Sequence, residues 1–239
     1  MRHVALITGG SRGLGATLAA FLAAQDYDLV LTSRHSDELD AAARALSHYS
    51  GRVLPIAGDV AEEDHRQKLI AAAWDLGGLD LLVNNASDLG PTPLPALADY
   101  PLDQLTRVLA VNVVAPLGLV QTALPLLQKR QGLVVNLSSD AALGGYPGWG
   151  GYGASKAALD LISLTLANEL KEHGVAVVSV DPGDMRTAMH QAAFPGADIS
   201  DRPLPEATIP FFAWLFGQEH GVVSSRRYRA QAAQWEIAA

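Results

Sequence analysis

The sequence predicts an α/β fold in which a parallel, doubly wound sheet carries helices on both faces. Six short apolar runs lack polar alternation, as strands buried on both faces do, and longer stretches with helical periodicity separate them. A glycine-rich turn follows the first run directly. With 239 residues, 49 % of them hydrophobic, and no Pro/Gly/Ser-rich linker, the chain is expected to form one domain over residues 1–239.

The expected elements alternate along the chain. Strands are predicted at residues 4–7, 28–32, 53–57, 79–83, 133–137 and 175–180, and helices at 14–24, 37–48, 62–76, 103–129 and 155–172. Residues 221–228 are expected to add an edge strand, followed by a short tail. This repetition predicts right-handed crossovers and a ligand site at the carboxyl ends of the strands.

Charge and composition exclude several classes of function. The net charge is -8, and the thirteen arginines and four lysines are scattered, which argues against nucleic acid as a partner. Arg226, Arg227 and Arg229 form the only basic cluster in the sequence, and three charges near a terminus predict a solvated face. The chain has no cysteine, so a disulfide frame, a thiol nucleophile and a thiolate metal site are excluded, and no metal is expected.

The N-terminal residues predict a soluble, cytoplasmic protein. The first strand begins at residue 4 and runs straight into the glycine turn, which leaves no room for a signal peptide. No uninterrupted apolar run reaches about 18 residues, so no membrane span is expected.

The glycine-rich turn predicts a phosphate site. Gly9, Gly13 and Gly15 allow close approach to a backbone whose free N–H groups, together with the helix dipole, can hold a pyrophosphate. No Lys-Ser/Thr pair follows the last glycine, so the turn is not a P-loop. Taken alone, it could also be an ordinary strand-to-helix turn. The residues expected to bind the cofactor here are Gly9, Ser11, Arg12, Gly13, Leu14 and Gly15.

The end of the second predicted strand favours NADP(H) over NAD(H). In dinucleotide folds an acid at this place favours a free ribose 2′-hydroxyl, whereas this chain has Ser33 and Arg34. Together with Arg12, two guanidinium groups can hold a 2′-phosphate, through hydrogen bonds worth about 1.5–3 kcal/mol each. Asp37 is the alternative reading in favour of NAD(H), but it lies three residues further on, at the start of the next predicted helix.

Tyr152 and Lys156 predict a proton-transfer pair. Four residues apart, they share one face of a helix, and the ammonium is expected to lower the pKa of the phenol from its usual value of about 10. Asn112 lies four residues before Pro116, which has no N–H, so the Asn112 carbonyl loses its intrahelical partner and can bind a water. A kink that serves packing alone is the other interpretation.

Together these segments resemble the short-chain dehydrogenase/reductase family over nearly the whole chain. The matching residues are Thr8 to Gly15, Asp59, Val60, Asn84, Asn85, Ala86, Asn112, Ser139, Tyr152, Lys156, Pro182, Gly183 and Thr187. The resemblance implies a Rossmann fold and a nicotinamide-dependent oxidoreductase that interconverts a carbonyl and an alcohol.

The resemblance also implies a role for each catalytic residue. Tyr152 would be the general acid or base, and Ser139 would hydrogen-bond the substrate oxygen. Lys156 would lower the pKa of Tyr152 and hold the nicotinamide ribose, while Asn112 would fix a water in a proton relay. The cofactor set implied in the same way consists of Asp59 and Val60 near adenine, Asn85 and Ala86 near the adenosine ribose, Thr187 near the carboxamide, and Tyr152, Lys156, Pro182 and Gly183.

The substrate side departs from the family pattern at Ser87, where a glycine is usual, and this puts the room for substrate in doubt. Tyr146, Trp149, Met185 and Phe194 are expected to form an apolar or aromatic pocket, beside Ser139, for a small or medium ketone, aldehyde or secondary alcohol. They could equally pack among themselves. Residues 185–208 are expected to form a mobile cover over this pocket.

The long predicted helices indicate self-association. Both 103–129 and 155–172 are apolar on more than one side, which predicts a homodimer or homotetramer. A function of another class stays open beside the enzyme, because a fold alone does not establish activity: a catalytically silent regulatory protein that binds NADP(H).

Overall fold

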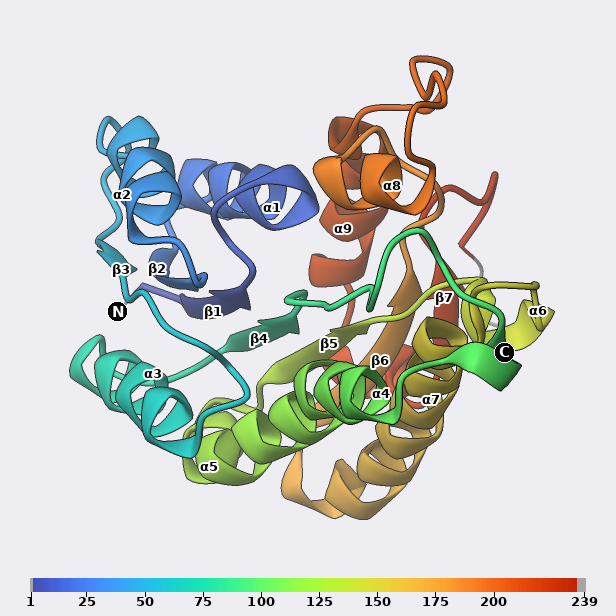
Figure 1. The fold of residues 1–239 in the computed structure, drawn as a ribbon. Coiled ribbons are helices and arrows are strands. Elements are labelled where there is room, and N and C mark those ends of the chain that lie inside the picture. The colour runs from blue at the N-terminus through green and yellow to red at the C-terminus, as the bar shows by residue number, and fades with distance from the viewer. Residues whose placement is uncertain (1, 236–239) are drawn as a thin grey trace.

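All seven strands of the protein join one parallel sheet, as seen in the computed structural model, which describes residues 2–235 (Figure 1). Each neighbouring pair runs parallel, and the spatial order is β3-β2-β1-β4-β5-β6-β7. The strands are β1 (Val4–Thr8), β2 (Asp28–Thr32), β3 (Val53–Pro55), β4 (Leu81–Asn84), β5 (Leu133–Leu137), β6 (Ala176–Asp181) and β7 (Arg227–Arg229). Strand order reverses between β1 and β4, and a crevice at such a switch point is where open α/β sheets bind ligands.

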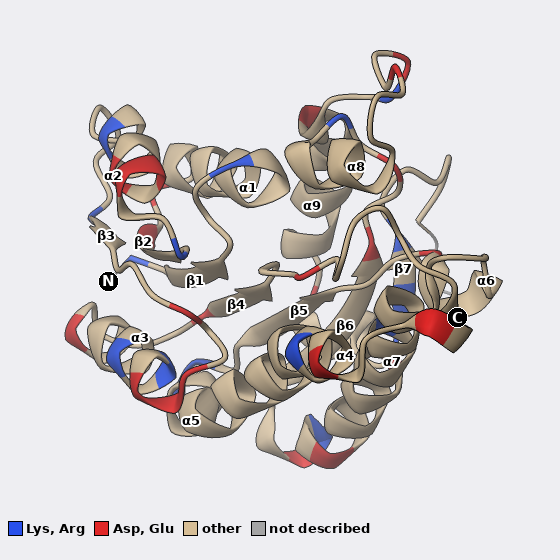
Figure 2. Ribbon diagram, in the orientation of Figure 1, with Lys and Arg blue, Asp and Glu red and all other residues tan. Residues whose placement is uncertain are grey.

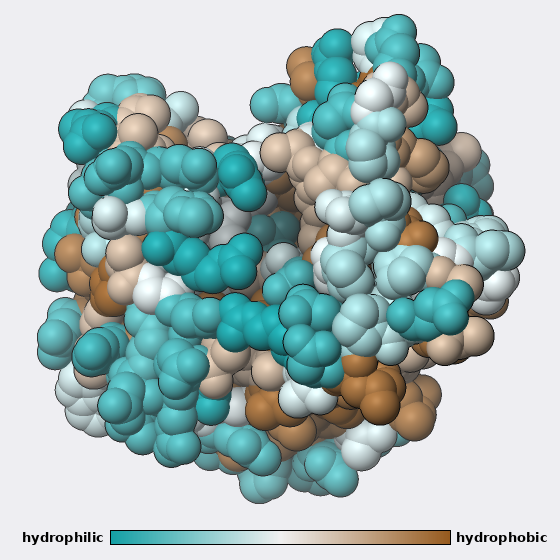
Figure 3. Space-filling view, viewed as in Figure 1, coloured by the Kyte–Doolittle hydropathy of each residue, from teal (hydrophilic) through white to brown (hydrophobic). Residues whose placement is uncertain are grey.

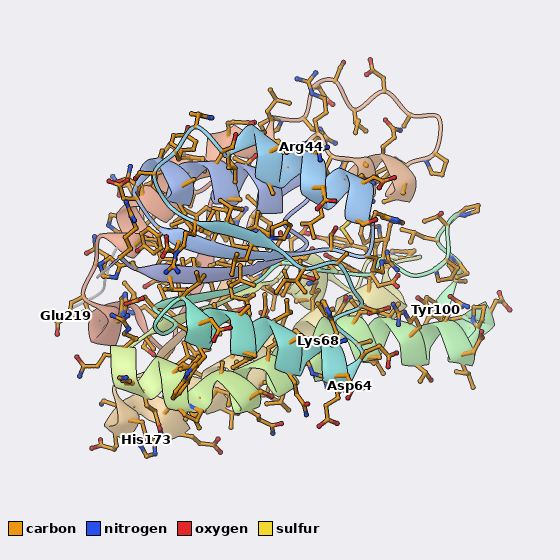
Figure 4. The ribbon with its side chains drawn as sticks, turned by 90° about the vertical axis from the view of Figure 1, so that its left-hand side faces the viewer. Arg44, Asp64, Lys68, Tyr100, His173 and Glu219 are labelled. Carbon is orange, nitrogen blue, oxygen red and sulfur yellow. The ribbon has the colours of Figure 1, made fainter. Side chains whose placement is uncertain are left out.

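Helices cover both faces of the sheet, which confirms the predicted doubly wound arrangement. One face carries α1 (Gly13–Ala24), α2 (Ser36–Ala45) and α9 (Ile209–Phe216), and the other carries α3 (Glu63–Asp75), α4 (Leu102–Leu109), α5 (Ala115–Arg130) and α7 (Gly150–Leu170). Viewed from the side, Arg44 on α2 and Lys68 on α3 lie on opposite sides of the sheet (Figure 4). Basic and acidic residues are interspersed over the ribbon (Figure 2).

Two apolar layers explain why the strands lack polar alternation. Successive side chains of a strand point to opposite faces. In β1, Ala5 and Ile7 belong to the layer that includes residues of α1 and α9, while Val4 and Leu6 belong to the layer that includes residues of α3 and α5. All four are fully buried, so neither face leaves room for a polar side chain.

A π turn, Ala110–Val114, interrupts the helix predicted at 103–129 and separates α4 from α5. Pro116 follows at the start of α5 and has no N–H to continue the regular ladder. The turn buries Asn112, consistent with the frequent occurrence of π-bulges at functional sites. By length and composition the whole stretch Leu102–Arg130 could cross a membrane, but 44 % of its apolar window is buried, and core helices of soluble proteins meet the same criterion.

Three segments differ from the sequence prediction. Residues 221–228 are not one strand: α10 (His220–Val223) comes first, Ser225 adopts a left-handed φ of 64°, and only then does β7 pair with β6. The predicted cover at 185–208 contains α8 (Ala188–Ala193) and a 3₁₀ turn. Helix α7 begins at Gly150, five residues earlier than predicted, so Tyr152 lies in its first turn.

Candidate active site

A cleft of about 760 Å³ opens at the carboxyl ends of the strands. Figure 3 shows the molecule hollowed between the side that carries α1 and α2 and the side that carries α8. The cleft brings most of the predicted cofactor residues together with the predicted catalytic pair. These lining residues are Gly9, Ser11, Arg12, Gly13, Leu14, Ser33, Arg34, Asp59, Val60, Asn85, Ala86, Tyr152, Lys156, Pro182, Met185 and Thr187.

The glycine turn and the end of β4 form one hydrogen-bonded unit. The Asn85 side chain donates to the carbonyls of Thr8 and Gly9, at 2.9 and 3.1 Å. The Thr8 hydroxyl accepts from the backbone N–H of Asn85 at 3.0 Å. A Cβ at Gly15 would lie 2.1 Å from the Gly9 carbonyl oxygen, so only glycine fits at position 15. Gly15 is not a lining residue of the cleft, so its lack of a side chain serves the packing of the turn, and the approach of a pyrophosphate to this backbone stays a prediction.

The open end of the cleft carries the residues predicted to read the ribose 2′ position. Arg12, Ser33 and Arg34 all line it. The side chain of Arg12 is 61 % exposed, and its guanidinium lies 3.6 Å from the Glu38 carboxylate. Asp37 lies beside Glu38 in the first turn of α2 and does not line the cleft.

Arg107 lines the cleft, and the sequence did not predict it as a site residue. From α4 its guanidinium binds the Asp59 carboxylate and lies 3.7 Å from that of Asp88. Burial acts to raise the pKa of Asp59, but the hydrogen bond from the Ala61 N–H and the Arg107 charge outweigh it, so this pKa lies below its usual value. In the sequence, Arg107 has no feature that separates it from a solvated helical arginine.

Tyr152 and Lys156 are both buried, with 9 % and 2 % of their surfaces exposed. The Lys156 Nζ donates to the Leu137 carbonyl at 2.7 Å and lies 5.5 Å from the centre of the Tyr152 ring. Burial lowers the pKa of Lys156 to about 8, although the Asp160 carboxylate opposes this. At neutral pH the ammonium is thus still mostly charged.

The pKa of Tyr152 differs from the sequence prediction. Burial raises it to about 12, even though the hydroxyls of Ser87 and Ser139 stabilise the phenolate and act to lower it. Lys156 is not among the groups that lower this pKa. Desolvation of the phenol is therefore the main cause of the shift and sets its direction.

Ser139 and Asn112 lie just behind the cleft wall. The Ser139 hydroxyl accepts from the Ala141 N–H at 3.2 Å and donates to Asp140 at 3.1 Å. The Asn112 amide donates to the Asp88 carbonyl at 2.8 Å and to the Ser155 hydroxyl at 2.9 Å. Both side chains are thus held by hydrogen bonds within the protein.

Ser87 connects Asn112 to the phenol. Its hydroxyl donates to the Asn112 side-chain oxygen at 3.1 Å and is also one of the two that stabilise the phenolate form of Tyr152. The position at which the sequence departs from the family pattern is therefore part of the polar network.

The predicted substrate residues differ in their distance from the cleft. Trp149 packs edge-on against Tyr152, with ring centres 5.8 Å apart, and Met185 lines the cleft. Tyr146 is 46 % exposed and does not line it. Leu89 and Met189 pack in the same apolar cluster as Tyr152 and Trp149.

The predicted residues that do not line the cleft are Gly15, Asn112, Ser139, Tyr146, Trp149, Gly183 and Phe194. Conversely, several lining residues were not predicted. His35, Asp88, Leu89 and Ser138 are among them and could have been found from their places beside Arg34, the segment 84–87 and Ser139, whereas Arg107 is distant from any motif.

Comparison with known proteins agrees with this geometry. A family model described as short chain dehydrogenase matches residues 3–198. The chain is 36 % identical over 190 residues to serine 3-dehydrogenase from Agrobacterium fabrum, covering 78 % of this chain and 74 % of that protein. It is 32 % identical over 213 residues to 2-(R)-hydroxypropyl-CoM dehydrogenase from Xanthobacter autotrophicus, covering 88 % and 84 %. A short chain dehydrogenase from Shigella flexneri complexed with NADP has a TM-score of 0.89 and 28 % identity, covering 96 % and 97 %.

Proposed function

The chain belongs to the short-chain dehydrogenase family, whose members are oxidoreductases acting on alcohols or carbonyls, and we propose that it uses NADP(H) to interconvert a carbonyl and an alcohol. The observation that carries the proposal is one cleft that contains the glycine turn at one end and the pair Tyr152 and Lys156 at the other.

The residues of the cleft fit a dinucleotide. The turn presents backbone N–H groups at the start of α1, whose first turn has no acidic residue, so a pyrophosphate is favoured there. Arg12 and Arg34 supply positive charge where a 2′-phosphate would lie, and a structural neighbour is described as complexed with NADP. When bound, the nicotinamide supplies or accepts the hydride.

Tyr152 moves the proton in this proposal. Its raised pKa keeps the phenol protonated at neutral pH, which suits donation to the oxygen of a carbonyl under reduction. The Ser139 hydroxyl, which donates to Asp140 in this structure, turns its proton to the same oxygen and stabilises its developing charge. Lys156 contributes its positive charge beside the phenol and holds the nicotinamide ribose, and Asn112 holds a water in the proton relay.

An apolar carbonyl or alcohol of small or medium size is the proposed substrate, because Leu89, Met185 and Met189 line the cleft, and Leu89 and Met189 pack in the same apolar cluster as Tyr152. We also place the protein in the cytoplasm as a homodimer or homotetramer. Exposed apolar side chains on α4 and α7, Leu102 and Leu161, support self-association.

Two measurements on the purified protein test the proposal. Side-by-side titrations are expected to show tighter binding of NADPH than of NADH. A panel of ketones, aldehydes and secondary alcohols, followed at the absorbance of the reduced nicotinamide, is expected to reveal turnover. Equal affinities would remove the preference for NADP(H). Binding of NADPH without turnover on any member of the panel would instead support the catalytically silent regulatory protein.

A further inference from the structure

Arg227 is not the solvated basic residue that the sequence predicted. Its side chain is only 22 % exposed, and from the edge strand β7 the guanidinium reaches the segment that follows β5. One guanidinium nitrogen donates to the main-chain carbonyl of Ser139 at 2.8 Å. Arg229, two residues further along the same strand, is exposed. The two arginines therefore differ in surroundings although they share a strand.

Two buried carboxylates complete the surroundings of Arg227. Its Nε donates to Asp160 at 3.0 Å, and a terminal nitrogen lies 3.5 Å from Asp181. The side chains of Asp160 and Asp181 are 16 % and 5 % exposed. Removing one partner of such a buried cluster leaves an uncompensated charge, so the guanidinium is needed to hold both carboxylates at this place. Its planar fork, unlike an ammonium, can bind several acceptors in fixed directions.

Both carboxylates interact with residues of the proposed active site. Asp160 follows Lys156 by one turn of α7, and its charge acts to raise the pKa of Lys156 against the effect of burial. Asp181 ends β6 and accepts from the N–H of Gly183 at 2.9 Å, which fixes the turn that begins the cofactor segment. Arg227 therefore joins the ends of β5 and β6 to α7.

We propose that Arg227 is a positioning residue for the reaction: by holding the Ser139 carbonyl, it fixes the Ser139 hydroxyl against the substrate oxygen. This inference rests on the proposed function. Arg227 acts through Ser139, which lies two residues after the end of β5 and whose carbonyl also accepts from the N–H of Ala142 at 3.1 Å; the Arg227 contact ties this local turn to β7. The effect on turnover arises because small displacements of a catalytic group cost large factors in rate.

The test compares Arg227→Met with Arg229→Met, which removes the same charge from an exposed residue two positions further along β7. Arg227→Met is expected to lower kcat on the order of 10–100-fold with a smaller change in KM, Arg227→Lys to restore part of the loss, and Arg229→Met to change neither. A kcat for Arg227→Met equal to that of Arg229→Met would overturn the proposal.

A double-mutant cycle separates positioning from general loss of structure. In a Ser139→Ala background, the Arg227 substitution is expected to cause little further loss of kcat, because its effect passes through the missing hydroxyl. An equal loss in both backgrounds would overturn the positioning role. Thermal melting checks that each variant is folded, and if Arg227→Met unfolds, the same cycle with Arg227→Lys decides. Absence of turnover in the unmodified protein would remove the proposed function along with this inference, whereas an active protein insensitive to Arg227 would remove this inference alone.

Discussion

The two ends of the cleft are built in opposite ways. At the phosphate end, formed by Arg12, Ser33 and Arg34, the Arg12 side chain is 61 % exposed and has one carboxylate at 3.6 Å. At the catalytic end, lined by Tyr152 and Lys156 with Asn112 and Ser139 beside them, Lys156 is 2 % exposed and hydrogen-bonded at 2.7 Å. An exposed ion pair of this kind contributes little to stability, whereas an unpaired buried group is costly.

This difference indicates which interactions fix the side chains at each end of the cleft. The catalytic groups are held by hydrogen bonds within the protein, so their geometry exists before a ligand binds, as catalysis by preorganised groups requires. The guanidinium groups at the phosphate end remain free to gain their strong partners from a ligand. Substitutions at the catalytic end should therefore change turnover, and substitutions at the phosphate end should change cofactor affinity.

The largest effect is expected for Tyr152→Phe. Without the phenol hydroxyl no side chain replaces the proton donor, so kcat should fall by roughly 10²–10⁴-fold. NADPH affinity, measured by titration, should stay nearly constant. Tyr49→Phe, which removes a phenol hydroxyl near the far end of α2, is the matched control. A turnover number close to that of the unmodified protein would contradict both the role of Tyr152 and the comparison.

Arg34→Ala should give the complementary result at the phosphate end. Loss of charge-assisted hydrogen bonds worth about 1.5–3 kcal/mol corresponds to a fall in NADPH affinity of roughly 10–150-fold, while the affinity for NADH should not change. Arg44→Ala, on the exposed surface of α2, provides the control. Equal losses for the two cofactors would show that Arg34 does not read the 2′-phosphate.

The smallest effect is expected for Ser87→Ala and concerns pH. The Ser87 hydroxyl stabilises the phenolate of Tyr152, so its removal raises the pKa of Tyr152 further. Alcohol oxidation needs the phenolate, so its rate should rise with pH. In Ser87→Ala this rise should occur about half a unit to one unit higher in pH than in the unmodified protein. Ser138→Ala is the control, because it removes a hydroxyl that is buried without a hydrogen-bond partner within residues 2–235. In this variant the pH at which the rate rises should not change. A rise of the oxidation rate that moves to lower pH, or that moves equally in both variants, would contradict the link between Ser87 and the phenol.

Sequence reasoning succeeded where one local pattern has one physical solution. Unbroken apolar runs require strands buried on both faces, and the structure confirms a parallel sheet with helices on each side. The glycines of the first turn and the spacing of Tyr152 and Lys156 place these groups in one cleft, because the ends of parallel strands meet at one edge of the sheet. The roles of these residues in chemistry stay predictions until the variants are measured.

By itself, then, the sequence determined the fold class, the position of the cleft and the residues of the proposed catalytic set. Only the tertiary structure decided the burial of Arg227, the bridge made by Arg107 and the rise in the pKa of Tyr152 to about 12. Each of these depends on segments far apart in the chain: burial and the partners of a charge are set by what packs around it, and periodicity along one segment carries no information about its distant neighbours.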